Sequence, residues 1–158
     1  MANTQSMTTS FLGQLLTGTH NFGVAPTRAT TAADTFKAAL YLTSATVNAS
    51  TTTYSTSGEV SGVGYTAGGV AVTNATVPAA TNSSPTAGVA YWTPSASISY
   101  TSVTLSTAFD AVLIYNSTQG DKTVSVHTFG SQTITAGTFT LTMPTNNTTT
   151  ALLRLSTT

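Results

Sequence analysis

Histidine and carboxylate side chains are the groups of this sequence that could do acid–base chemistry, and the chain holds two histidines and four carboxylates. His127 could pair with Asp110, and one of the many serines would complete a hydrolase-like triad. No Gly-x-Ser-x-Gly motif, which presents a nucleophilic serine at a sharp turn, occurs in the chain. We therefore expect His127 to be a strand histidine bonded to the backbone or at a subunit contact. We expect no catalytic residues and no enzymatic activity.

Metal, cofactor and phosphate sites are also not indicated. His20 has no second histidine or carboxylate at ligand spacing, so we expect a cation at a helix C-terminus or a contact to the neighbouring arm. The run Gly64–Gly69 lacks the Gly-Lys-Ser/Thr ending of a phosphate-binding loop and precedes a strand pattern, which predicts a turn. Because the chain has no cysteine, disulfides and cysteine-ligated zinc are excluded. No cofactor and no metal are expected.

Three aromatic residues could lie at the surface: Tyr65, Tyr91 and Trp92. They could form a sugar-binding shelf or anchor a protein interface, whereas core packing is the alternative for Tyr91 and Trp92. Asp110 lies inside an apolar run and needs a partner if it points inward. Arg154, Lys122 or a backbone amide could be that partner.

Charged residues make up only 5% of the chain, against about a quarter in a typical soluble domain. Four basic residues cannot build the basic face that a nucleic-acid-binding protein needs. No apolar run approaches the roughly 18 residues of a membrane span. We therefore expect no direct contact with nucleic acid and none with a membrane. A formal net charge of zero removes the electrostatic repulsion that keeps protein molecules apart, so we expect the chain to assemble into a dimer or trimer.

Hydrophobic residues recur with a period of two from position 35 onward, which is typical of strands. The run 108–115 is almost continuously apolar and predicts a central strand buried on both faces. The apolar positions change parity near Thr101 and Ser102, which predicts a bulge or bend. The fold class that we expect is all-β, an antiparallel β-sandwich or jelly roll of about nine or ten strands. The expected strands include 36–42, 70–73, 90–92, 98–105, 108–115, 123–129, 132–134, 139–143 and 152–155.

A short helix is expected only near the N-terminus, where four apolar residues share one helical face: Phe11, Leu12, Leu15 and Leu16. Thr8, Thr9 or Ser10 could cap its start, and Gly18 could end it. The segment 21–31 shows no periodicity and is expected to be a connecting arm. We therefore divide the chain into an N-terminal helix and docking arm, residues 1–31, and a β-sandwich domain, residues 32–158. The four apolar residues and Tyr65 are the candidate interface residues.

Four stretches of the chain resemble small structural proteins of tailed bacteriophages. They are 1–20, beginning MANTQSMTTSF, 36–41 (FKAALY), 64–69 (GYTAGG) and 111–116 (AVLIYN). The chain is also similar in size and pattern to the small β-rich decoration, or cement, proteins that cover many phage capsids. This resemblance implies a virion component, and the sequence supplies no catalytic motif to carry over. A composition typical of extracellular proteins, at a start without the features of a signal peptide, leads us to expect a virion protein that is made and assembled in the host cytoplasm.

Our main hypothesis is therefore a capsid decoration protein on the capsid surface, which clamps neighbouring subunits of the major capsid protein. The alternative is a tail- or fibre-associated adhesion module that binds host surface glycans through Tyr65, Tyr91 and Trp92. An esterase-like enzyme that uses His127 is the third and weakest hypothesis.

Overall fold

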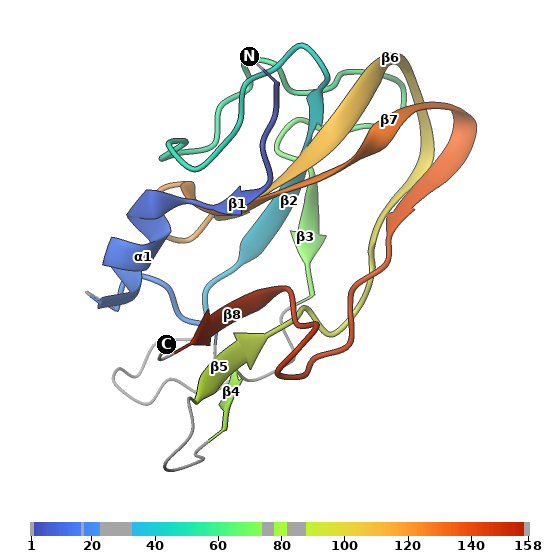
Figure 1. Ribbon diagram of the computed structural model, residues 1–158. Helices are drawn as coiled ribbons and strands as arrows, with labels where there is room; N and C mark the ends of the chain where they lie inside the picture. Colours follow the sequence, from blue (N-terminus) through green and yellow to red (C-terminus); the bar gives the residue numbers. More distant parts are fainter. Residues whose placement is uncertain (1, 17, 23–32, 74–77, 82–87, 157–158) are drawn as a thin grey trace.

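The described regular structure consists of a five-stranded and a three-stranded antiparallel sheet and one short helix (Figure 1). The computed structural model describes residues 2–16, 18–22, 33–73, 78–81 and 88–156. The strand orders are β1-β7-β6-β2-β3 and β4-β5-β8. The elements are β1 (Ser6–Met7), α1 (Thr9–Leu16), β2 (Phe36–Leu42), β3 (Val70–Val72), β4 (Ala79–Ala80), β5 (Val89–Trp92), β6 (Ile98–Asn116), β7 (Lys122–Leu141) and β8 (Leu153–Ser156).

The predicted all-β antiparallel class is confirmed, but the described residues form eight strands rather than nine or ten. The expected strands 98–105 and 108–115 are one strand, β6, and the three expected between 123 and 143 are one strand, β7. These two strands pair with each other from Ile98–Leu141 to Asn116–Lys122, with five register shifts along the way. The shifts interrupt the alternation of apolar residues while the ladder continues, so the sequence pattern predicts shorter strands than the structure has.

The predicted bend near Ser102 is confirmed. Ser102 has a φ of 55°, and the register of β6 against β7 shifts between Tyr100 and Val103. Only the part of β6 from Phe109 to Asn116 pairs with β2. In Figure 1 β6 and β7 run side by side and curve together away from β2 at their outer ends. The part of the β6–β7 pair that extends beyond β2 therefore lies over the larger core and does not continue the sheet.

The central strand β6 is buried on both faces from Ala111 to Asn116, as its apolar run predicts. One face belongs to the larger core, which includes Leu40, Val112 and Ile114. The other face packs a smaller core, which includes Tyr41 and Leu113. Because β7 and β2 flank β6, residues on those neighbouring strands are placed precisely against either core.

The described part of the expected docking arm is packed into this body. Asn3 donates from Nδ2 to the backbone oxygen of Leu42, and β1 pairs with β7. Phe11 is 2% exposed and lies in the larger core, so it is a core residue and not an exposed anchor. The helix ends as predicted near Gly18, whose φ is 67°. The expected linker residues 23–31 lie outside the described residues.

Candidate functional site

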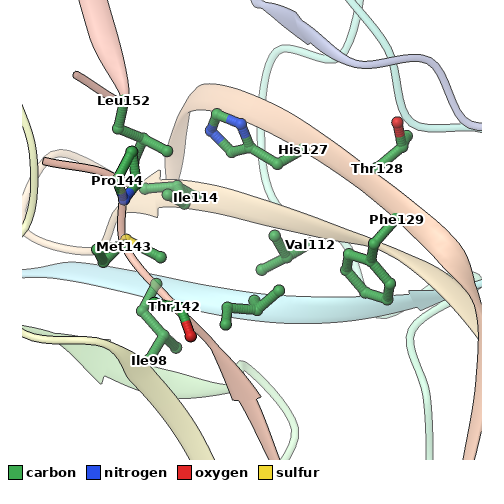
Figure 2. Close-up of a pocket in the computed structure, with 11 residues that line it drawn as sticks. Ile98, Val112, Ile114, His127, Thr128, Phe129, Thr142, Met143, Pro144 and Leu152 are labelled. Atoms are coloured by element: carbon green, nitrogen blue, oxygen red, sulfur yellow. The ribbon is translucent and has the colours of Figure 1, made fainter. Parts of the chain in front are cut away.

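The hollow around His127 is the candidate site, because it combines an apolar chamber with free polar groups. The chamber has a volume of about 140 Å³. Figure 2 shows His127 on one side of it, close to Pro144 and Leu152, with Val112 and Ile114 on the neighbouring strand. The lining residues come from β6, β7 and the segment that leads to β8: Ile98, Val112, Ile114, His127, Thr128, Phe129, Leu141, Thr142, Met143, Pro144 and Leu152.

A bulge in β7 explains why His127 faces this chamber. The register of β6 against β7 shifts between Ile114–Ser125 and Tyr115–Thr123. The extra residue places Ser125 and His127 on the same face as Ile114 and Val112, their partners on β6. A histidine within the alternating pattern of a strand therefore points into an otherwise apolar hollow.

The imidazole of His127 is neutral at pH 7 because burial lowers its pKa to about 4. Its Nε2 atom lies 2.9 Å from Ser125 Oγ, at hydrogen-bond distance. The other ring nitrogen, Nδ1, makes no hydrogen bond with the described residues and is not among their fully buried unpartnered atoms.

An open groove of about 400 Å³ adjoins the chamber and shares His127, Pro144 and Leu152 with it. Arg154 on β8 is exposed and lines this groove, together with Gln5 and Thr150. No hydrogen bond or ion pair of the Arg154 side chain is present within the described part of the chain. No carboxylate side chain of the described residues lines the chamber or the groove.

The hypothetical triad of Asp110, His127 and a serine is not formed. Asp110 Oδ1 instead accepts a hydrogen bond of 2.6 Å from Asn3 Nδ2, and Asn3 Oδ1 accepts one of 3.0 Å from the backbone of Val47. Ser125, the serine next to His127, is only 1% exposed, so a substrate could not reach its hydroxyl. The partner of Asp110 is thus the side-chain amide of Asn3 and not Arg154, Lys122 or a backbone amide. Nothing in the sequence near Asp110 indicates this contact.

Of the two roles expected for His20, the cation at a helix end is wrong, whereas its ring does contact Phe22 of the expected arm, with ring centroids 6.2 Å apart. Burial lowers its pKa to about 4, and the carboxylate of Asp34 offsets only part of this effect. The ring nitrogens are both used, because Asn116 Nδ2 donates to Nδ1 at 3.1 Å and Nε2 donates to Gln14 Oε1 at 2.7 Å. Among the described residues, no group of three or more metal-ligating side chains is present.

Glu59 carries a second buried polar cluster, which the sequence analysis missed. Its carboxylate is 9% exposed and accepts hydrogen bonds from Tyr54 Oη at 2.6 Å, Tyr65 Oη at 2.7 Å and the Gly68 amide at 2.8 Å. Burial, together with the hydrogen bond to the Glu59 carboxylate, raises the pKa of the Tyr65 hydroxyl. The only sequence signal is an acidic residue just before the run Gly64–Gly69.

The remaining candidate interface and shelf residues are mostly engaged in packing. Leu15 is partly buried against the larger core, and the side chains of Leu12 and Leu16 lie outside the described set. Tyr65 stacks on Tyr100 with ring centroids 5.9 Å apart. Trp92 is 3% exposed, which agrees with the core-packing alternative.

A scan of protein-family models, a search of curated proteins and a search of solved structures each gave no match to this chain. Within its described residues, no helix is long and apolar enough to cross a membrane.

Proposed function

We propose that this protein is a structural component of a bacteriophage virion, a capsid decoration protein that clamps neighbouring subunits of the major capsid protein. The resemblance of its four sequence stretches to small phage structural proteins is one support. The all-β fold is another, because small β-rich bodies suit repeated contact across a shell. The protein acts in this proposal by shape and buried area, not by chemistry.

The observation that carries the proposal is the internal use of the ionisable groups. The carboxylates of Asp34, Glu59 and Asp110 accept hydrogen bonds from neighbouring side chains, and both histidines are neutral and hydrogen-bonded. With charged residues at only 5% of the chain, few charges then remain at the described surface. Such a surface binds a partner at little electrostatic desolvation cost.

Clamping follows from repetition of a modest contact. An interface of about 1,000 Å² at each capsid junction is enough for a specific contact. Many such contacts over one shell add to its stability, because each bound copy holds two capsid subunits together and so raises the effective concentration of the neighbouring contacts. A dimer or trimer of the chain would bridge more than one capsid subunit.

Copy number tests this proposal directly. Quantitative mass spectrometry of purified particles should give hundreds of copies, in a stoichiometric ratio to the major capsid protein. Particles made without the gene should release DNA at a lower temperature, and adding the purified protein should restore the original temperature. Absence of the protein from mature particles would contradict the proposal.

A tail- or fibre-associated adhesion module is the alternative, and it predicts only a handful of copies at one vertex. The structure gives its aromatic shelf little support, because Trp92 is buried and the Tyr65 hydroxyl donates to Glu59. Binding of the purified protein to host glycans, with few copies per particle, would favour it over decoration.

A further inference from the structure

The chamber beside His127 has the size and lining of a small apolar binding site. Its volume of about 140 Å³ is close to that of engineered protein cavities of about 150 Å³ that bind benzene. Ile98, Phe129 and Met143 are among its apolar walls. A group of about six carbon atoms therefore fits the chamber.

The groove that opens from the chamber offers donors for an anion. Arg154 presents a guanidinium without a partner in the described chain, and the guanidinium fork matches the two oxygens of a carboxylate. The Ser125 hydroxyl has no other hydrogen-bond partner among the described residues, so we assign it as the donor to His127 Nε2, and this assignment places the ring proton on Nδ1. Among the described lining residues no acidic side chain competes for these donors.

We propose that this chamber and groove bind a carboxylate carried on an apolar group of about six carbon atoms, with the apolar group in the chamber and the carboxylate between Arg154 and His127. A free monocarboxylate has this chemistry, and so does the C-terminal residue of a peptide with an apolar side chain. The inference does not depend on the decoration function, because it concerns only the groups that line this hollow.

The decisive comparison is between hexanoate and two related ligands, one with the opposite charge and one without the apolar tail. Hexanoate should bind the full-length protein with a Kd on the order of 1 mM, which is typical of a ligand of this size. Hexylammonium and acetate should bind at least about tenfold more weakly, because one has the wrong charge and the other has no tail for the chamber. Amide and methyl NMR shifts should map to His127, Met143 and Leu152.

Two Gln substitutions, one at Arg154 and one at a control position, test the role of Arg154. Arg154→Gln should weaken hexanoate binding about five- to tenfold, because the charge is lost while the exposed position tolerates the change. Lys122→Gln is the matched control, since Lys122 lies outside the chamber and groove and donates to the Gln119 carbonyl. It should change the affinity less than twofold.

The His127 ring provides a second readout. A bound carboxylate should raise the pKa of His127 from its value of about 4, because the anion favours the imidazolium form. NMR titration of the ring with and without hexanoate measures this shift.

An N-acetylated dipeptide that ends in leucine tests whether the ligand is the C-terminus of a peptide, and preferential binding of either carboxylate supports the site. Equal binding of hexanoate and hexylammonium, or shifts that map away from His127, would overturn the proposal. Neither result would bear on the copy number in the virion.

Discussion

Glu59 is a buried carboxylate that is stabilised by hydroxyl groups instead of a cation. Both of its oxygens accept hydrogen bonds, Oε2 from Tyr54 and Oε1 from Tyr65 and the Gly68 amide. The Tyr65 hydroxyl in turn accepts a hydrogen bond of 3.0 Å from the Leu40 amide. These bonds join the loop that contains Glu59 to β2 and to the turn before β3. Since every donor points at the carboxylate, the cluster requires an acceptor at this position.

We predict that Glu59→Gln lowers the free energy of unfolding by about 1–3 kcal/mol, because the amide nitrogen of glutamine cannot accept from a tyrosine hydroxyl. Chemical denaturation with urea measures the change. Asp121→Asn is the control, because Asp121 has a φ of 58°, which asparagine tolerates well. The control should stay within about 0.5 kcal/mol of wild type. An equal loss in both variants would contradict the importance of the cluster.

The amide of Asn116 fixes the protonation state of His20. Asn116 Oδ1 accepts hydrogen bonds of 3.1 Å from the amides of Thr118 and Gln119, so the side chain cannot flip. Its Nδ2 must then donate to His20 Nδ1 and to Asp34 Oδ2. A proton on Nδ1 would place two donors face to face. The folded protein therefore favours neutral His20.

We predict that this preference makes stability fall in mild acid. The pKa of His20 is about 4 in the folded chain and about 6.5 in the unfolded chain, so the unfolded state binds the proton first. The contribution is complete above about pH 6.5 and is lost as the pH falls toward 4, and its size is up to about 3 kcal/mol. Urea denaturation at several pH values measures it. His20→Gln should reduce the slope of the curve in this window by about half, because His127, whose pKa is also lowered to about 4, keeps its own contribution. A variant curve parallel to that of wild type would count against the argument.

At the scale of elements, Gly69 lets the turn before β3 approach β2 closely. A Cβ atom at Gly69 would lie 1.7 Å from the carbonyl oxygen of Ala38, and the residue has a φ of 71°. Gly120 in the β6–β7 turn has a similar φ of 67°, but a Cβ atom there would meet nothing within 4 Å. The two glycines therefore separate the cost of backbone conformation from the cost of a steric clash.

We predict that Gly120→Ala destabilises the protein by about 1–2 kcal/mol, the cost of a left-handed conformation for alanine. Gly69→Ala should cost at least about 2 kcal/mol more, because β3 must move away from β2. Thermal and urea denaturation of the two variants measure the difference. Similar losses would show that β3 moves away without cost.

The helix α1 is attached to the body by a cluster of aromatic rings. The Phe11 ring lies 5.0 Å from that of His20 and 5.9 Å from that of Phe22, measured between centroids. Phe22 stacks on Phe36 of β2 at 4.4 Å and contacts Trp92 of β5 at 4.7 Å. The cluster thus connects the N-terminal segment to both sheets.

We predict that Phe11→Ala lowers the free energy of unfolding by about 3–5 kcal/mol, the usual cost of removing a buried phenylalanine. Leu155→Ala is the control, because Leu155 is 39% exposed. It should cost less than about 1 kcal/mol. A Phe11 variant that keeps its stability but loses capsid binding would instead identify Phe11 as a docking residue.

At the scale of the whole molecule, alternation of apolar residues was enough to predict the fold class, the central strand and the bend at Ser102. It was not enough to predict strand length, because bulges in β6 and β7 reverse parity without ending the pairing. The candidate site was not predicted from the sequence, where His127 was expected to be a strand histidine bonded to the backbone or at a subunit contact. His127 stands out by residue type, but the chamber forms from segments far apart in the chain, and only the folded bulge reveals its lining. The Asp110–Asn3 contact joins residues 107 positions apart, a distance at which local patterns carry no signal.

The low charge of the whole chain leads to a last prediction, on salt. The described acidic groups Asp34, Glu59 and Asp110 are held by hydrogen bonds from neutral donors, and these bonds are short-range and partly buried. Salt screens charges that lie about 10 Å or more apart at 0.1 M ionic strength, but it has little effect on such bonds. The free energy of unfolding at pH 7 should therefore change by less than about 0.5 kcal/mol between roughly 0.05 and 0.5 M NaCl. Urea denaturation at both concentrations tests this. A strong salt dependence would mean that ion pairs, and not hydroxyl and amide donors, stabilise the folded protein.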